Sequence, residues 1–144
     1  MRRRDLLASL PLALAAGGAF AEGGSKQAGQ YVDLSPVAMP IVVNGRLINY
    51  VFVYMRINLT PMADVVRLRD KEPYFRDALV RMAHRTPFTV ATDYTRVDEP
   101  RLKASLYQAA VAIAGPGAVA SVEVMPGGGP MRRTGLPKPG TPIR

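Results

Sequence analysis

The sequence predicts an α+β fold in which a small antiparallel sheet carries helices on one of its faces. Two β-prone runs between residues 37 and 59 flank an Asn44-Gly45 pair, which is a strong hairpin signal. Between residues 60 and 115, apolar side chains recur at helical spacing behind prolines and capping residues. A valine-rich run at residues 118–125 then predicts a last strand.

Composition allows one small domain and excludes several kinds of site. The chain has 144 residues, a net charge of +8 and 48% hydrophobic residues, as is typical of a globular protein. Zero cysteines exclude a disulfide scaffold, a cysteine-ligated zinc site, an iron–sulfur cluster and a cysteine nucleophile. A single histidine excludes a multi-histidine metal site. We therefore expect neither a metal nor a cofactor.

Residues 1–21 have the organisation of an export signal. Arg3 and Arg4 belong to a basic start, residues 6–16 form an apolar run, and Ala19 and Ala21 frame a small-residue cleavage site. The arginine pair, followed by a spacer and two apolar residues, resembles a twin-arginine signal. We expect export to the periplasm with cleavage after Ala21. The alternative is an uncleaved membrane tether, although the apolar run is shorter than the roughly 20 residues of a membrane span.

The basic excess lies mostly outside the predicted folded body. Residues 1–21 and 22–124 each carry a net +2, whereas residues 125–144 carry +4. A nucleic-acid-binding domain needs a basic face on its folded part, so we expect no nucleic-acid partner. Residues 22–30 are predicted to be a flexible linker. Residues 125–144 are rich in glycine and proline and are predicted to be a disordered tail, which solubilises the protein or weakly contacts anionic lipid or polymer.

The folded body, residues 31–124, is expected to begin with a short extended segment and a hairpin. Pro40 lies within the strand-like run 37–43 and places it at a sheet edge or at a bulge. A two-residue turn at Asn44-Gly45 predicts these opposed pairs: Val43 and Arg46, Ile41 and Ile48, Met39 and Tyr50, Val37 and Phe52.

The second strand of this hairpin has two faces, and both are largely apolar. Alternation assigns one set to each face. The aromatic set is Tyr50, Phe52, Tyr54 and Arg56, and the other set is Leu47, Asn49, Val51, Val53, Met55, Ile57 and Leu59. One face must pack on helices. We expect the aromatic face to be either covered by chain or offered to a partner, which makes it a candidate partner face.

Three helices are expected after the hairpin. Thr60 is the predicted cap of the first, with Pro61 at its first helical position, and Pro73 opens the second. Asp98, followed by an acid and a proline, opens the third, and a Gly-Pro-Gly segment ends it. Residues 88–97 are expected to be irregular or briefly extended.

We predict no catalytic residues. His84 is the only histidine, and the acid on its own helix, Asp77, is seven positions away. Asp98 and Glu99 are explained as the start of a helix rather than as paired catalytic acids. The sequence contains no nucleophile elbow and no nucleotide-binding glycine motif. The expected function is therefore not enzymatic.

Four segments of the body resemble the periplasmic domain of the flagellar basal-body protein FliL. Residues 31–36 resemble its entry strand, and residues 46–59 resemble its hairpin and long second strand. In the opening of the second helix, Pro73, Arg76 and Asp77 resemble the family signature, followed by a Thr-Pro turn. The last helix and the valine strand also occur in the corresponding order.

This resemblance implies a stomatin/prohibitin-like α+β fold and a non-enzymatic role. It also implies association with basal-body or stator components, often as a ring of subunits, in support of motility. Arg76 and Asp77 would pair structurally or hold a neighbouring subunit. The cleavable signal and the Gly/Pro/Arg-rich end differ from the family, so we expect an exported relative. The alternative is an envelope-binding module unrelated to flagella, which uses its basic tail on anionic polymer or lipid.

Overall fold

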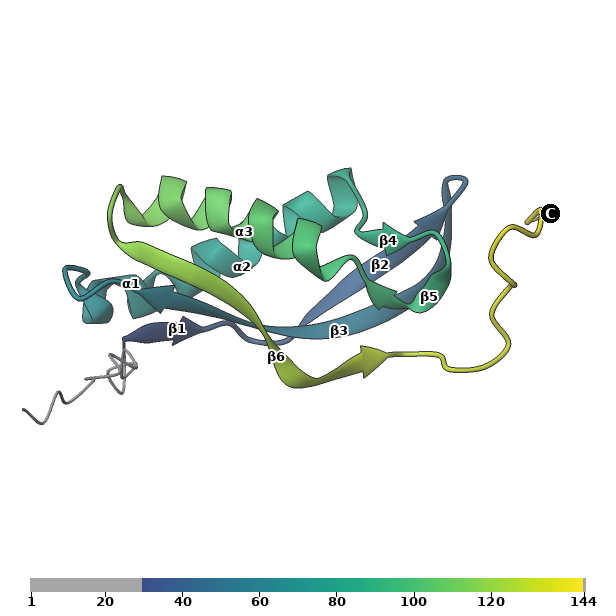
Figure 1. Cartoon of the computed structure of the whole chain (residues 1–144), viewed down its shortest axis with the longest axis horizontal. Helices are drawn as coiled ribbons and strands as arrows, with labels where there is room; N and C mark the ends of the chain where they lie inside the picture. Colours follow the sequence, from purple (N-terminus) through teal and green to yellow (C-terminus); the bar gives the residue numbers. More distant parts are fainter. Residues whose placement is uncertain (1–29, 144) are drawn as a thin grey trace, which may run out of the picture.

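A computed structural model describes residues 30–143 as a layer of helices on an antiparallel sheet (Figure 1). The predicted α+β class is confirmed. Arg3, Arg4, Ala19 and Ala21 of the predicted signal lie outside the described residues. The elements are β1 (Tyr31–Asp33), β2 (Val37–Val43), β3 (Arg46–Leu59), α1 (Val65–Asp70), α2 (Glu72–Arg85), β4 (Thr89–Val90), β5 (Asp93–Val97), α3 (Glu99–Ala114) and β6 (Val119–Pro130).

Strand β3 is the centre of the sheet, and every other strand of that sheet pairs with it in antiparallel orientation. Strand β6 runs beside Val51–Leu59 of β3 and so overlaps the stretches that pair with β1 and with β2. Because a strand has only two hydrogen-bonding edges, β1 and β2 must share the other side of β3. The sheet is thus three strands wide along most of its length.

The hairpin turn is confirmed, but the predicted register beyond it is wrong. Asn44 and Gly45 have φ angles of 51° and 73°, and Val43 lies opposite Arg46. A bulge between Ile41 and Val42 then shifts the register by one residue. The observed pairs are Ile41 with Asn49, Met39 with Val51 and Val37 with Val53, in place of Ile48, Tyr50 and Phe52.

The bulge decides which side chains of β2 enter the core. A shift of one residue moves a strand's side chains to the opposite face relative to its partner. Val37, Met39 and Ile41 therefore share the helix-covered face with Val51 and Val53, and all five are at most 5% exposed. On the other face of the sheet, Ala38 and the other outward residues of β2 lie beside the aromatic residues of β3.

Pro40 lies on the edge strand β2, as its missing N–H predicted. Two residues after Pro40, at Val42, the Thr89 hydroxyl occupies the edge of β2. It accepts a hydrogen bond from the Val42 N–H and donates one to the Val42 carbonyl, each at 3.1 Å. On the opposite side of the sheet, β6 pairs with β3 alone among the described strands.

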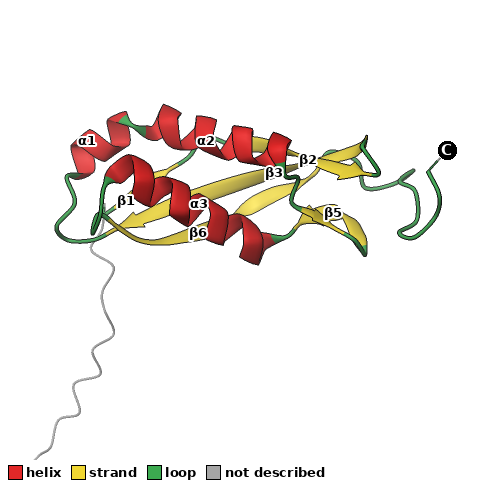
Figure 2. Ribbon diagram, turned by 90° about the horizontal axis from the view of Figure 1, so that it is seen from above, coloured by secondary structure: helices red, strands yellow, loops and turns green. Residues whose placement is uncertain are grey.

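The core lies between β3 and the helices. Figure 2 shows α2 and α3 side by side above the sheet, with α1 continuing the row of α2. Inward-facing β3 residues pack there on apolar stripes of α2 and α3, which recur at three- and four-residue spacing. The fully buried residues on these helices are Phe75, Leu79, Leu102, Leu106 and Ala110.

The starts of α2 and α3 follow the predicted signals, whereas the start of α1 does not. Pro73 is in the first turn of α2, and the Asp98 carboxylate caps α3 by accepting a hydrogen bond from the Arg101 N–H at 3.2 Å. Helix α1 begins at Val65 behind an Asp64 cap, so the predicted cap at Thr60 is wrong.

Thr60 does not cap a helix because its polar groups bind the chain before β6. Its hydroxyl donates to the Gly117 carbonyl at 2.6 Å, and its N–H donates to the Ala118 carbonyl at 2.9 Å. Residues 88–97, expected to be irregular or briefly extended, contain the short β4–β5 hairpin. This hairpin packs on the helix-covered side of the sheet, where the Tyr94 carbonyl accepts a hydrogen bond from the buried Asn49 amide.

The predicted start of the disordered tail at residue 125 is wrong. Strand β6 continues to Pro130, with Met125 opposite Tyr54 and Gly129 opposite Phe52. Glycines permit this pairing: a Cβ at Gly128 would lie 2.3 Å from the Phe52 carbonyl oxygen, so the strands approach there only because it has none.

The chain stays attached beyond β6 through Asn49. The Asn49 side-chain carbonyl accepts from the Arg132 N–H at 3.1 Å, and its amide donates to the Arg132 carbonyl at 2.9 Å. Asn49 is 3% exposed and is the only buried polar side chain among the residues described. Leu136 also packs on the core. Residues 125–136 thus belong to the folded body.

We expect Gly128→Ala to lower the free energy of unfolding by about 1–3 kcal/mol, because the β3 and β6 backbones must separate to admit the methyl group. Gly129→Ala is the matched control, because the atom nearest to its Cβ, in the Arg133 side chain, is 3.5 Å away. Urea unfolding of both variants checks this expectation. Equal stability of the two would contradict the close approach of the strands.

Candidate protein interface

The outer face of the sheet, opposite the helices, carries the aromatic row Tyr50, Phe52, Tyr54 and Arg56 predicted as a partner face. No helix of the described residues lies beneath it (Figure 1). Phe52 is 39% exposed and Tyr54 37%, while Tyr50 and Arg56 are half-buried. Alternate residues of a strand lie about 7 Å apart, so the three rings form a line along β3.

Small neighbours on both adjacent strands explain the exposure of Phe52. Ala38 of β2 lies opposite it on one side, and Gly129 of β6 lies opposite it on the other. Cross-strand neighbours normally cover much of an aromatic ring. Here a methyl group and a glycine leave the ring flanks open. Tyr54 has a larger neighbour, Met125.

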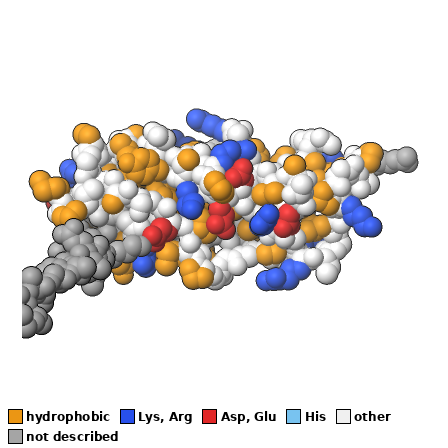
Figure 3. All heavy atoms as spheres, in the orientation of Figure 1, with side chains coloured by type: hydrophobic (Ala, Val, Ile, Leu, Met, Phe, Trp, Pro, Cys, Tyr) orange, Lys and Arg blue, Asp and Glu red, His pale blue; other side chains and the backbone are white. Residues whose placement is uncertain are grey.

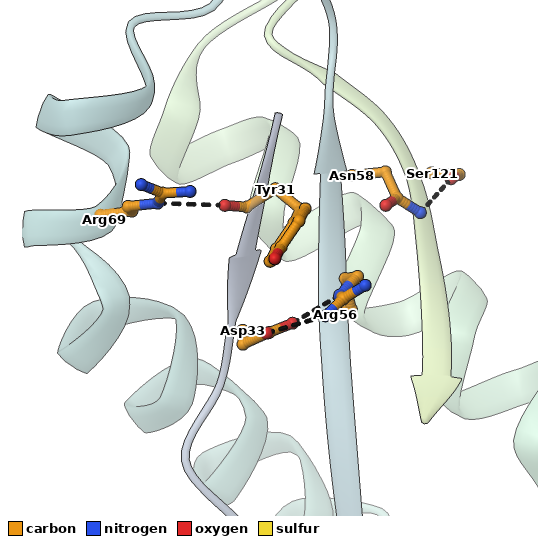
Figure 4. A network of polar contacts seen from close by, with 6 residues as sticks. All are labelled: Tyr31, Asp33, Arg56, Asn58, Arg69 and Ser121. Atoms are coloured by element: carbon orange, nitrogen blue, oxygen red, sulfur yellow. Dashed lines mark hydrogen bonds and ion pairs between the residues drawn. The ribbon is translucent and has the colours of Figure 1, made fainter. Parts of the chain in front are cut away.

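Arg56 ends the row in a polar cluster that anchors β1 (Figure 4). Its Nε and Nη2 donate to the two Asp33 carboxylate oxygens at 2.5 and 2.9 Å. The guanidinium carbon stands 3.8 Å from the centre of the Tyr31 ring, and that of Arg69 stands 5.9 Å from it. Arg69 also donates from Nε to the Tyr31 carbonyl at 3.3 Å. One residue of α1 and one of β3 thus hold the three-residue strand β1.

The ion pair makes this end of the face electrically compensated. The hydrogen bond from Arg56 to Asp33 raises the pKa of the guanidinium above its usual value, and the charges of Asp33 and Glu123 add to this. Arg56 is therefore charged at neutral pH, as arginine side chains in proteins are. Beyond it, the Asn58 amide donates to the Ser121 hydroxyl at 2.9 Å. The outer face is an aromatic row that ends in a neutralised, hydrogen-bonded rim.

The family-signature residues Pro73, Arg76 and Asp77 lie on α2, across the sheet from the aromatic row, so the structure does not bring the two sets together. All three are exposed. Asp77 forms an ion pair with Arg81 at 2.6 Å, one turn along the helix, rather than with the adjacent Arg76.

His84 is exposed near the end of α2, and its imidazole forms no hydrogen bond or ion pair with another described residue. Residues 30–143 contain no cluster of three or more His, Cys, Asp or Glu side chains suited to a metal ion. Within the same range, no helix is both long and apolar enough to cross a bilayer. Acidic and basic side chains are interspersed on the side of the molecule seen in Figure 3, with hydrophobic patches between them.

A second surface feature was missed in the sequence: an open groove of about 620 Å³ between α2 and the end of α3. Lys71, Tyr74, Ala78, Arg81 and Arg85 line it. Their spacing of three and four residues is a helical stripe, which is the signal that could have found it. The sequence pattern does not show how α3 packs, so it could not show that this stripe lies beside α3.

No protein-family model matches the chain, and no curated protein matches it either.

We expect Asp33→Asn to loosen β1, because the bidentate ion pair with Arg56 becomes a weaker contact with a neutral amide. Amide hydrogen exchange of residues 31–33 should become roughly five-fold faster. Asp77→Asn is the control, because it removes an exposed ion pair within α2 and should leave β1 unchanged. An unchanged exchange rate in Asp33→Asn would show that β1 is held without the ion pair.

Proposed function

We propose that this chain is an exported, non-enzymatic interaction domain, comparable in role to FliL, that binds protein through the aromatic row on the outer face of its sheet. The observation that carries the proposal is the exposure of Phe52 and Tyr54 on a sheet face without a helical cover. The partners proposed are flagellar basal-body or stator components, or further copies of the chain itself.

The chemistry of the outer face suits a protein partner. Aromatic rings contribute much apolar contact area and have few rotatable bonds to immobilise, so they often dominate binding energy. A 14-residue strand in a sheet three strands wide offers a face of roughly 650 Å², close to the ~800 Å² per partner of a standard interface. The Arg56–Asp33 pair supplies a polar rim to this apolar centre.

The flagellar part of the proposal is supported by the resemblance of residues 31–124 to the periplasmic domain of FliL. The α+β fold, with its long strand β3 followed by helices and a last strand β6, is compatible with that resemblance. We propose on the same basis that the fold is stomatin/prohibitin-like and that the domain assembles with basal-body components. The periplasmic location rests on the signal-like residues 1–21.

We expect Phe52→Glu to weaken self-association or partner capture at least about ten-fold, because a charge would be buried in the interface. Val66→Glu is the matched control, because Val66 is 72% exposed on α1, away from the outer face. Light scattering of the full-length chain, affinity capture from envelope extracts and rescue of motility in a deletion strain measure the effect. Phe52→Glu behaving as wild type in all three assays would refute the proposal.

A second candidate is an envelope-binding module that uses its basic tail on anionic lipid or polymer. Arg133 and Lys138 are exposed, and the attachment of Arg132 to Asn49 presents them from the folded body. A vesicle-binding experiment with the same Phe52→Glu variant separates the two candidates. Retention on phosphatidylglycerol vesicles that high salt abolishes, and that Phe52→Glu leaves intact, would favour the tail.

We expect replacement of Arg3 and Arg4 by lysine to prevent export, because a twin-arginine signal depends on the arginine pair. In the wild type, mass spectrometry of the periplasmic protein should find Glu22 as the first residue. Arg2→Lys is the control, because it retains the pair and should leave export unchanged. Periplasmic accumulation of the double variant would exclude the twin-arginine route.

A further inference from the structure

The groove runs along α2, with Ile113 of α3 beside it, on the opposite side of the molecule from the aromatic row. The start of α2 meets the end of α3, because the Lys71 ammonium donates to the Ile113 carbonyl at 3.3 Å. The two helices are therefore antiparallel and run side by side (Figure 2). The groove follows α2 from Lys71 to Arg85, which is about 21 Å at 1.5 Å per residue.

The floor of the groove is apolar. It is formed by Ala78 and Met82 of α2 and by Ile113 of α3, all partly exposed rather than fully buried. Tyr74 stands at the groove with 66% of its surface exposed, which is high for a tyrosine beside apolar neighbours. A volume of about 620 Å³ is within the range of ligand-binding sites, and its open form suits an elongated ligand.

The charged side chains around this floor are predominantly cationic. The groove is lined by three cationic side chains, Lys71, Arg81 and Arg85, and by one carboxylate, Asp77. Asp77 is already paired with Arg81, so the two remaining cations lie at the two ends of the groove: Arg85, and Lys71, whose ammonium donates to the Ile113 carbonyl. The Arg85 guanidinium forms no hydrogen bond or ion pair with another described residue. An elongated ligand with acidic groups at both ends of an apolar centre would therefore be complementary.

We propose that this groove binds an amphipathic α-helix of a partner protein whose apolar stripe is flanked by Asp or Glu. A helix laid along α2 in this groove would bury apolar side chains at positions i, i+3 or i+4, and i+7. A helix of about 14 residues matches the length of the groove. Its acidic residues would pair with Arg85 and Lys71. This surface is separate from the outer face, so the domain could hold two partners at once.

Fluorescence anisotropy with the full-length chain tests this inference. The probe is a labelled 15-residue helical peptide with leucines in one stripe and glutamates beside them, and a matched peptide carries lysines in place of the glutamates. We expect the glutamate peptide to bind more tightly, with an affinity that falls as salt rises. Arg85→Glu should weaken its binding about three- to ten-fold.

The control is Arg76→Glu, because Arg76 is exposed on the same helix, outside the groove, and undergoes the same change of charge. It should bind the glutamate peptide as the wild type does. Phe52→Glu should also bind normally, which distinguishes this inference from the proposed function. Circular dichroism confirms that each variant folds.

Three outcomes would overturn the inference. The first is equal weakening by Arg76→Glu and Arg85→Glu, or equal binding of the two peptides, because either result means that only the general charge matters. The second is Arg85-dependent binding of phosphatidylglycerol vesicles without peptide binding, which would assign the groove to lipid. The third is a change in self-association in Arg85→Glu, which would assign it to a second copy of the chain.

Discussion

The alternation of inward and outward side chains along β3 is the constraint on which the rest of the structure depends. From Asn49 to Leu59, every second residue points toward the helices, and all of these inward residues are buried. Strands β1, β2 and β6 take their register from β3, and the helix stripes pack on its inner face. The residues between them, including Phe52 and Tyr54, are forced to the outer face whether or not anything covers them. The core and the candidate interface are therefore two consequences of one pattern.

Asn49 marks the point at which this pattern changes from apolar to polar. It continues the inner face of β3 past the helices, to where β5 and the segment after β6 meet. A buried amide there satisfies one carbonyl of β5 and both backbone groups of Arg132, which would otherwise be costly to enclose. Three segments distant in sequence are joined by a single side chain, which is why the chain stays on the body beyond its last strand.

The sequence predicted correctly those features that neighbouring residues determine, such as a tight turn and a helix cap. Asn44-Gly45 adopts the positive φ angles that the turn requires, and Asp98 caps the helix that follows it. The strand alternation also found the aromatic row. The sequence could not give the bulge at Ile41, because the packing of β2 under the helices selects it, or the role of Thr60, because its partners come from residues 117 and 118. The sequence likewise could not predict a strand at Gly128, because the reason for a glycine there is its close approach to the Phe52 carbonyl in the paired strands. It could not predict the groove either, because Ile113 reaches it only through the packing of α3.

The two edges of the sheet are unequal, and this limits how such molecules could join. On the β2 side, Pro40 has no N–H to donate, and Thr89 already occupies both backbone groups of Val42. On the other side, no strand among residues 30–143 pairs with the outer edge of β6. A strand could be added at the outer edge of β6, whereas Pro40 and Val42 of β2 leave fewer backbone groups for pairing at the far edge. Edge pairing between identical subunits is therefore favoured at β6 over β2, and pairing of two β6 strands would close as a symmetric pair.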